Sequence, residues 1–433
     1  MRKLKFNVWT CLLAVVLLVN LVCGFRAHCE EQPKPDYILE KLDAFIEVLQ
    51  LIRQNYVDID DVKIENLLDS ATTGLVEGLG DPYSSFMPPE EGKWMEEELS
   101  GEFGGVGLIL HESDNFPVVI AAIEGTPAYK AGFLPGDVIL KINGKDVQGH
   151  RLDYSVTSLR GEVGTTVQVT FGRKDEEEPR TVTLTRAMIP VQTVQGARVL
   201  DGTSIGYVRI TQFSGPTAKD LKHALRKLAD QKITGLILDL RGNPGGLLDS
   251  AVDICSLFLP KGQPVVSVEG LRKEDNFTEI SRSVPDFPNY YQKNQACPLV
   301  IMIDGGSASA SEITAGCLRD LNRAVLLGEK SFGKGSVQNI LALRRGYTLK
   351  LTIAKYYTPS RKVIHNKGIE PDILCKMSEE DYQQIIKART EQERAQHDTQ
   401  LQKAIEFLQN GGRLPEDAAT VIPQDNQAQE TEE

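Results

Sequence analysis

The sequence predicts an α/β protein in which helices cover a largely parallel sheet, with a smaller β-rich domain and helical segments at both ends. Three observations lead to this fold class. Strand-like apolar runs alternate with helical patterns over residues 187–375, short β-like runs follow one another over residues 98–186, and apolar residues recur at helical spacing within residues 35–97. A chain of 433 residues is also long for one hydrophobic core, so two or three domains are expected.

Residues 1–24 have the layout of a secretory signal. Basic residues at positions 2, 3 and 5 precede an apolar run from about Val8 to Cys23, and polar residues follow. The apolar run is near the lower limit for spanning a bilayer, so an uncleaved membrane anchor is the alternative. In either case we expect the folded part to be exported to the periplasm or cell envelope, with any membrane association made through the N-terminus.

Residues 35–97 are expected to form a helical segment that serves in docking or dimerisation. The turn-forming run Gly80-Asp-Pro-Tyr-Ser84 interrupts the helical pattern near its end. Amphipathic helices here and near the C-terminus lead us to expect a homodimer. The apolar residues at helical spacing include Leu39, Leu42, Ile46, Leu49 and Ile52.

Residues 98–186 are expected to form a separate β-rich domain. Asn143-Gly144, directly after a strand-like run, is a strong hairpin signal. Residues 104–108 form a glycine-rich loop entering a strand, which can hold a terminal carboxylate while the strand edge pairs with a peptide. Alone, that loop is equally typical of a plain hairpin. With the second glycine-containing element at 131–144 it resembles a PDZ domain, whose peptide-binding residues would be Gly105, Val106, Gly107 and Leu108.

Residues 187–375 are expected to form the catalytic domain. Apolar runs at 205–210, 235–240, 299–303 and 324–328 alternate with helical patterns, which is typical of a parallel sheet covered on both faces. Residues 376–433 are expected to form a helical, acidic C-terminal extension that ends in a disordered polar tail.

Ser309 stands directly before a helical pattern and is a candidate nucleophile. An oxyanion formed at a helix start would be stabilised by free backbone N–H groups, with Ala310 as the natural first donor. The glycine-rich turn at 242–246, which follows an apolar strand, offers a second donor. The alternative is a plain helix cap, because Ser309 and Glu312 also match a capping box.

Lys334, between two glycines, is a candidate general base. Burial would have to lower its pKa from about 10.4 to roughly 7 to 8 to supply the neutral amine. Gln338 lies four residues on, on the same face of an extended strand, and its neutral amide could orient the amine without raising its pKa. The alternative is a phosphate-binding loop, which requires Ser or Thr where Gly335 stands.

Composition excludes several other classes of protein. The formal net charge of −12 argues against a nucleic-acid partner, because phosphate binding needs a surplus of basic residues. The 7 cysteines form no close pairs and the 6 histidines are scattered, so we expect neither a metal site nor a cofactor. No Gly-x-Ser-x-Gly element is present, which argues against a histidine-based triad.

With these residues assembled, the chain resembles the C-terminal processing peptidases, or tail-specific proteases, over roughly residues 39–374. The resemblance rests, besides the PDZ-like segment, on Asp81-Pro-Tyr-Ser84, Leu240-Arg-Gly-Asn-Pro-Gly-Gly246, Gly306-Ser-Ala-Ser-Ala-Ser-Glu-Ile313, Gly328-Glu-Lys-Ser-Phe-Gly-Lys-Gly335 and Tyr357-Thr-Pro-Ser360.

The resemblance implies a crotonase-like α/β protease core with an inserted PDZ domain. It implies that Ser309 is the nucleophile, Lys334 the general base and Gln338 its orienting partner. The oxyanion hole would consist of Ala310 with Gly245 or Gly246. Asp320 occupies a place where the family often has an acidic residue, and a structural contact at the helix end is the favoured interpretation.

One departure from the family is Arg361, which follows Thr-Pro-Ser where the family usually has glycine. We expect it to alter a turn or the rim of the substrate site.

The expected function is therefore that of an exported serine endopeptidase. It would bind protein or peptide substrates by their C-terminus at the PDZ domain and cleave them through an acyl-enzyme. The alternative class is a catalytically silent PDZ scaffold of the cell envelope.

Overall fold

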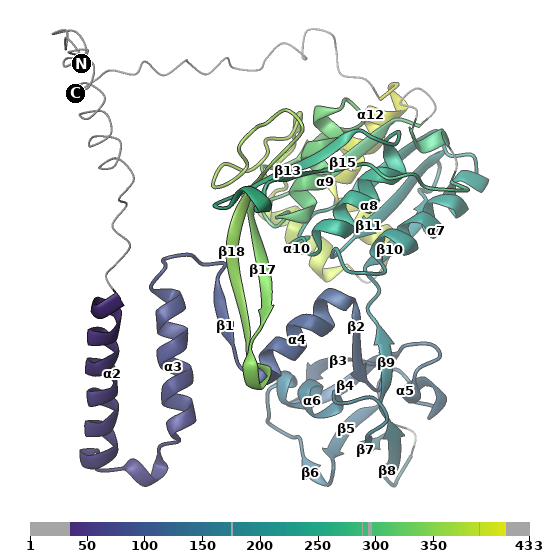
Figure 1. The fold of residues 1–433 in the computed structure, drawn as a ribbon. Helices are drawn as coiled ribbons and strands as arrows, with labels where there is room; N and C mark the ends of the chain where they lie inside the picture. Colours follow the sequence, from purple (N-terminus) through teal and green to yellow (C-terminus); the bar gives the residue numbers. More distant parts are fainter. Residues whose placement is uncertain (1–34, 175, 288, 293–296, 389, 413–433) are drawn as a thin grey trace, which may run out of the picture. The chain divides into compact units, whose positions relative to one another are not determined.

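The computed structural model describes residues 35–174, 176–287, 289–292, 297–388 and 390–412 (Figure 1). The chain divides into two compact units, one up to Gly74 and one from Leu75 onward. The predicted signal or anchor at 1–24 and the polar tail from 413 lie outside the described residues. Within the described ranges, no helix is both long and apolar enough to cross a membrane.

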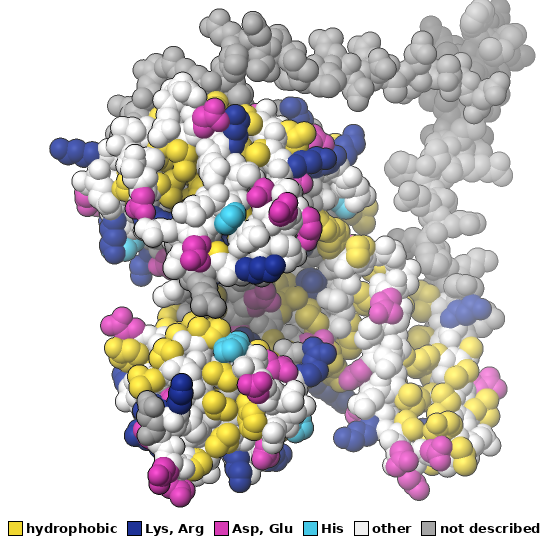
Figure 2. All heavy atoms as spheres, turned by 180° about the vertical axis from the view of Figure 1, so that it is seen from behind, with side chains coloured by type: hydrophobic (Ala, Val, Ile, Leu, Met, Phe, Trp, Pro, Cys, Tyr) yellow, Lys and Arg dark blue, Asp and Glu magenta, His cyan; other side chains and the backbone are white. Residues whose placement is uncertain are grey.

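The first unit is helical, as the apolar spacing predicts. It contains α2 (Pro35–Asn55), the short 3-10 helix η1 (Ile59–Asp61) and most of α3 (Ile64–Glu77). Large apolar side chains of α2 remain exposed, and Figure 2 shows hydrophobic side chains gathered on this helical segment. Four of them, between 42% and 53% exposed, follow helical spacing: Ile38, Leu42, Phe45 and Ile46.

The second unit begins with a tight turn that leads into strand β1 (Ser85–Met87) and helix α4 (Pro89–Ser100). The Asp81 carboxylate accepts hydrogen bonds from the Tyr83 backbone N–H (3.1 Å) and the Ser84 hydroxyl (2.6 Å), which is the local bonding typical of an Asx turn. The Ser84 hydroxyl accepts from the Thr352 N–H at 3.0 Å, and β1 pairs with β18 (Thr348–Tyr357). These contacts fix the turn on β18.

Residues 102–190 contain the predicted β domain. Asn143 and Gly144 both have positive φ (49° and 74°) and join β5 to β6, which confirms the hairpin. A ribbon of β2 (Glu102–Gly105) and β9 (Ala187–Pro190) connects the domain to the rest of the unit. The sheet runs in the order β3 (Leu108–Ser113), β4 (Phe116–Ala122), β5 (Val138–Ile142), β7 (Thr166–Gly172) and β8 (Arg180–Thr185), with β6 (Lys145–Asp146) on β5 and with helices α5 (Pro127–Lys130) and α6 (Leu152–Leu159).

The α/β core confirms the predicted parallel sheet. Every neighbouring pair from β11 to β19 is parallel, and β10 alone is antiparallel to its neighbour. The strand order is β10 (Val194–Val199), β11 (Ile205–Ile210), β12 (Gly235–Asp239), β15 (Leu299–Ile303), β16 (Val325–Gly328) and β19 (Ile373–Leu374).

Helices cover both faces of this sheet. Successive side chains of a strand point to opposite faces, so strands that are apolar throughout need cover on both sides. Leu236 and Leu238 of β12 belong to the hydrophobic core shared with α7 (Thr217–Asp230), α8 (Leu248–Phe258) and α9 (Ala310–Asp320). Ile237, between them, belongs to a second core that includes apolar residues of α12 (Thr399–Gln409).

A second sheet carries the predicted lysine segment. Its order is β1, β18, β13 (Pro264–Gly270) and β14 (Phe277–Ile280), and β17 (Ser336–Ala342) pairs antiparallel with β18. Figure 1 shows β17 and β18 as a long arm that extends from the α/β core. Short 3-10 helices lie at η2 (Lys273–Asp275), η3 (Asn289–Gln292) and η4 (Arg344–Gly346).

The C-terminal extension is helical, with α10 (Glu379–Lys387) and α11 (Glu391–His397) before α12. Its last helix is built into the core rather than appended to it. The guanidinium of Arg241 forms ion pairs with Asp239 (2.8 Å) and with Asp398 (2.7 Å), the N-cap residue of α12. Buried, mutually paired charges of this kind join the end of β12 to the last helix.

Candidate active site

Ser309 lies at the turn between β15 and α9 in a strained conformation. Its φ of 54° and ψ of −114° fall outside the regions that non-glycine residues ordinarily adopt, and the turn leads from a strand into a helix. Such a turn exposes a nucleophile above the end of a sheet. Ser309 and Glu312 match the capping box considered above, and its Glu312 half is formed, because the Ser309 backbone N–H donates to that carboxylate at 2.9 Å; no cap hydrogen bond to the Ser309 hydroxyl is described.

Glu312 joins the serine segment to the lysine segment. Its fully buried carboxylate accepts backbone N–H groups from Ser309 (2.9 Å), Gly333 (2.7 Å) and Lys334 (2.8 Å), and the Ser331 hydroxyl at 2.6 Å. Burial raises the pKa of Glu312, and these hydrogen bonds act in the opposite direction. The sequence indicated Glu312 only as part of a capping box.

Tyr356 on β18 makes a second connection between the same two segments. Its buried hydroxyl bonds the carbonyl oxygens of Ser309 (3.1 Å) and Lys334. Burial, and then the charge of Glu312, raise the pKa of Tyr356 well above its usual value, so the phenol stays neutral. Nothing in the sequence pattern singled out this residue.

Lys334 lies in the loop between β16 and β17 and is half-buried. Burial is the main cause that lowers its pKa, and the charge of Lys350 acts in the same direction. The negative charges of Asp81 and Glu312 oppose the shift. The amine nitrogen lies 5.0 Å from the ring centroid of Tyr83, and its described contacts include no hydrogen bond to Ser309 or Gln338.

Gln338 lies on β17, the strand that follows Lys334. Its side-chain amide donates to the hydroxyls of Ser336 (2.9 Å) and Thr352 (3.1 Å). The structure therefore places Gln338 on the strand that follows the lysine loop, with its amide nitrogen bonded to hydroxyls. Its role as the orienting partner of the lysine stays a prediction.

The predicted oxyanion residues lie around the serine turn. A Cβ added to Gly245 would lie only 2.7 Å from the Cβ of Ser309 and 2.8 Å from the nitrogen of Ala310, so only glycine allows this approach. The Gly245 N–H donates to the Asn243 side chain at 2.9 Å. The Gly246 N–H has no protein partner among the described residues, while its neighbours Gly245 and Leu247 bond Phe213.

Asp320 and Arg361 lie at the far end of the nucleophile helix. Asp320 accepts hydrogen bonds from the backbone N–H (3.1 Å) and the hydroxyl (2.6 Å) of Ser360, so it makes the structural helix-end contact that we favoured. Arg361 has a φ of 62°, which explains why glycine suits this position. Its guanidinium is held by Glu269 and stacks on Tyr357 with a centroid distance of 5.2 Å.

The predicted peptide-binding loop of the β domain leads into an edge strand. Residues 105–108 connect β2 to β3, and β3 pairs only with β4 within the described sheet. Gly107 has a φ of 81°, and a Cβ there would lie 2.4 Å from Thr126. Helix α6 packs near β3, so the free edge and the helix together have the arrangement with which a PDZ fold binds an extended peptide.

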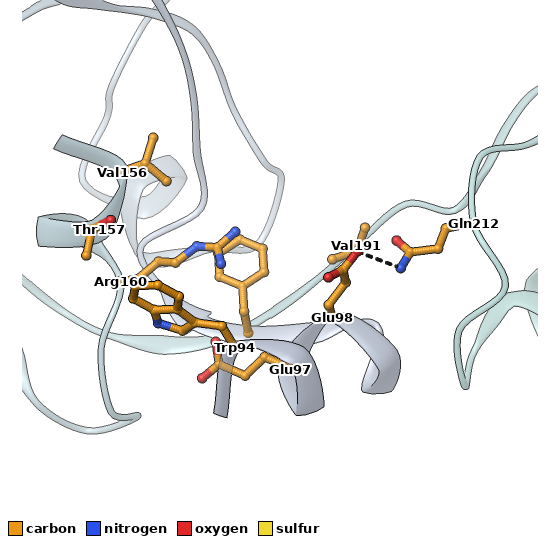
Figure 3. Close-up of a pocket in the computed structure, with 9 residues that line it drawn as sticks. Trp94, Glu97, Glu98, Val156, Thr157, Arg160, Val191 and Gln212 are labelled. Atoms are coloured by element: carbon orange, nitrogen blue, oxygen red, sulfur yellow. Dashed lines mark hydrogen bonds between the residues drawn. The ribbon is translucent and has the colours of Figure 1, made fainter. Parts of the chain in front are cut away.

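A separate pocket of about 360 Å³ lies where the β domain adjoins α4 (Figure 3). The guanidinium of Arg160, at the end of α6, lies 4.4 Å from the ring centroid of Phe103, and Trp94 lines the same pocket. Gln212 donates to Glu98 at 3.2 Å along its wall. The lining includes none of the predicted catalytic or peptide-binding residues.

A half-buried serine on a strained turn, a half-buried lysine on the adjoining segment and an attached β domain with a free strand edge are together typical of a serine protease. Comparison with known proteins gives the family. The model for peptidase family S41 matches residues 204–375, that for the PDZ domain matches residues 104–184, and that for the N-terminal domain of the activating protease CtpB matches residues 25–91.

Curated relatives extend these matches over most of the chain. A carboxy-terminal-processing protease of Bartonella bacilliformis is 40% identical over 339 residues, covering 77% of this chain and 75% of the relative. A carboxyl-terminal-processing protease of Synechocystis sp. is 34% identical over 427 residues, covering 94% of this chain and 95% of the relative. Among solved structures, a photosystem II D1 C-terminal processing protease aligns with 27% identity over 77% of this chain and 92% of that chain, with a TM-score of 0.42.

The chain therefore belongs to the carboxy-terminal processing proteases of peptidase family S41 and is a serine protease with a PDZ domain. This membership favours the enzyme over the catalytically silent scaffold. PDZ domains bind the C-termini of peptides, which agrees with peptide substrates.

Proposed function

We propose that the protein cleaves peptide bonds by a Ser-Lys mechanism in which Ser309 is the nucleophile and Lys334 the general base. The observation that carries this proposal is the bridge made by Glu312, which bonds the backbone of a strained serine and that of a half-buried lysine with one carboxylate. Neutral Lys334 accepts the hydroxyl proton as Ser309 attacks the substrate carbonyl. The resulting ammonium returns the proton to the leaving amine, and water then hydrolyses the ester to free the serine.

Backbone N–H groups would stabilise the oxyanion. Ala310, the first residue of α9, has an N–H at the positive end of the helix. Of the two candidate glycines, Gly246 is favoured as the second donor, because the Gly245 N–H is already bonded to Asn243. Gln338 would orient Lys334 through its side-chain amide oxygen once the amine approaches Ser309, because its amide nitrogen already donates to the hydroxyls of Ser336 and Thr352.

We further propose that Gly105, Val106, Gly107 and Leu108 hold the C-terminal carboxylate of the substrate. Backbone N–H groups of a glycine-rich loop favour a carboxylate, and the free edge of β3 can pair with the residues before it. The substrate class would then be proteins or peptides with an accessible, extended C-terminus.

Amidation of the C-terminus of a peptide substrate is expected to weaken its binding about 10- to 100-fold, because the charge-assisted hydrogen bonds of the carboxylate are lost. The rate of cleavage at low substrate concentration should fall by the same factor as the binding affinity. Fluorescence anisotropy and initial cleavage rates of matched peptides check this. The control is the same peptide acetylated at its N-terminus, and equal cleavage of the amidated and free-acid peptides would overturn C-terminal recognition.

We propose a homodimer formed through the apolar face of α2. A monomer would leave the face formed by Ile38, Leu42, Phe45 and Ile46 in water, and a second copy could cover it. Leu42→Glu and Phe45→Glu together should convert a dimer to a monomer by light scattering. The control is Ala44→Glu, which is exposed and lies about half a turn away from Leu42. A wild-type monomer, or a dimer that survives the double variant, would contradict the proposal.

Export of the protein through the signal or anchor at residues 1–24 stays a prediction.

A further inference from the structure

We propose that Tyr83 is a positioning residue for Lys334. Its ring holds the charged amine in the resting enzyme, and the amine leaves the ring when it acts on Ser309. This inference rests on the proposed role of Lys334 as the general base. It assigns a function to the Asp81-Pro-Tyr-Ser84 turn, which the proposed mechanism does not otherwise use.

The geometry is that of a cation–π contact. The Lys334 amine nitrogen lies 5.0 Å from the centroid of the Tyr83 ring, within the distance of about 6 Å over which aromatic rings attract cations. In this position the amine makes no described hydrogen bond to Ser309 or Gln338. The arrangement is therefore a resting one, and catalysis requires the lysine side chain to move.

The ring is held in place by contacts that do not involve the lysine. Asp81 bonds the Tyr83 backbone N–H and the Ser84 hydroxyl, and Ser84 in turn accepts from the Thr352 N–H on β18. Strand β1 follows directly and pairs with residues 348–350 of the same strand. Strand β18 also carries Tyr356, which bonds the backbone of both catalytic segments. The same strand therefore holds the Tyr83 ring and the lysine loop in place.

The charges around Lys334 show how the Tyr83 ring affects the protonation of its amine. Burial and Lys350 on β18 lower the pKa of Lys334, whereas Asp81 in the turn and Glu312 on α9 raise it. A ring face attracts the ammonium form far more than the neutral amine, so Tyr83 acts together with Asp81 and Glu312. Burial, and then the charges of Glu312 and Asp81, raise the pKa of Tyr83, so the ring remains a neutral phenol. Tyr83 thus favours the form of Lys334 that cannot act as a base.

The test is the pH dependence of kcat/KM for three proteins: wild type, Tyr83→Phe and Tyr83→Leu. Activity should rise with pH as Lys334 loses its proton. In Tyr83→Leu the leucine fills much of the same space but lacks the ring. The rise of kcat/KM with pH should therefore occur at a pH lower by about 0.4 to 1.5 units than in the wild type. Tyr83→Phe retains the ring, so its kcat/KM should rise at the same pH as that of the wild type. The matched control is Phe86→Leu, which removes an aromatic ring that stacks on Tyr347 instead.

A second measurement keeps the outcome independent of catalysis. In the Ser309→Ala background, the pKa of Lys334 can be read from the pH dependence of its acetylation, mapped by mass spectrometry. Tyr83→Leu should lower this pKa and Tyr83→Phe should not. The same pKa in both variants would overturn the inference, as would an equal shift in Phe86→Leu. If the pKa shifts but kcat/KM does not follow it, the contact with the ring stands and the proposed role of Lys334 as the base fails.

Discussion

Lys334→Ala and Ser309→Ala are each expected to reduce kcat/KM by at least about a thousandfold, because removal of either half of a nucleophile and base pair abolishes activation of the hydroxyl. Lys334→Arg should be as inactive as Lys334→Ala, since a guanidinium with a pKa above about 12 keeps the positive charge but cannot accept the proton. Cleavage of a peptide with a free C-terminus, followed by mass spectrometry, provides the measurement.

The control for these variants is peptide binding by the PDZ domain. Neither Ser309 nor Lys334 belongs to residues 105–108 or to β3, so the affinity for a C-terminal peptide should remain within about twofold of the wild type, as expected for independent sites. Retained affinity with lost cleavage would place the defect in the chemistry. Full cleavage by Lys334→Ala would refute the assignment of the base.

Glu312→Ala should have the second largest effect, on both stability and activity. It would leave three backbone N–H groups and the Ser331 hydroxyl without their acceptor in a buried setting. Each unsatisfied group costs about 1 to 3 kcal/mol, so a loss of at least about 3 kcal/mol in the free energy of unfolding is expected. The serine and lysine segments would also lose their connection, and kcat should fall with stability.

Two variants separate these effects, with thermal unfolding and kcat measured on each. Glu312→Gln retains one acceptor oxygen and should lose less stability than Glu312→Ala. Ser331→Ala removes only one of the four hydrogen bonds and leaves those to Ser309, Gly333 and Lys334 in place, so kcat should be much less affected. Wild-type stability and kcat in Glu312→Ala would show that the bridge has no role in holding the site.

Features governed by local pattern could be predicted from the sequence. The apolar runs at 235–240 and 299–303 became neighbouring strands of a parallel sheet, because a strand buried on both faces must be apolar along its whole length. Asn143-Gly144 gave the expected hairpin, since both residues adopt positive φ. The helical pattern before residue 80 appears as α2 and α3.

Contacts between distant segments could not be predicted in the same way. Glu312 matched a capping box, but its bonds to Gly333 and Lys334 depend on how two loops meet in the folded chain. The contact of Lys334 with the Tyr83 ring depends on the pairing of β1 with β18. Spacing along one strand suggested that Gln338 faces Lys334, but it could not reveal that the amide nitrogen of Gln338 donates to hydroxyls on β17 and β18.

The strain at Ser309 and the place of α12 also lay beyond sequence patterns. A positive φ at a serine has no signature in composition, although Gly245 and Gly306 lie where a side chain would collide with neighbouring backbone around the turn. Helix α12 was expected as part of an extension, and only its buried residues Leu401, Ala404 and Leu408 reveal that it belongs to the core.

The central claim is that Lys334 activates Ser309, and labelling with a serine-reactive phosphonate tests it most directly. In the wild type, mass spectrometry should locate the label on Ser309, with a labelling rate that rises with pH. In Lys334→Ala the same serine should be labelled at least about a hundredfold more slowly, because general-base assistance contributes factors of about 10² to 10⁴. A label on another residue, or labelling of Ser309 at the wild-type rate without Lys334, would contradict the claim.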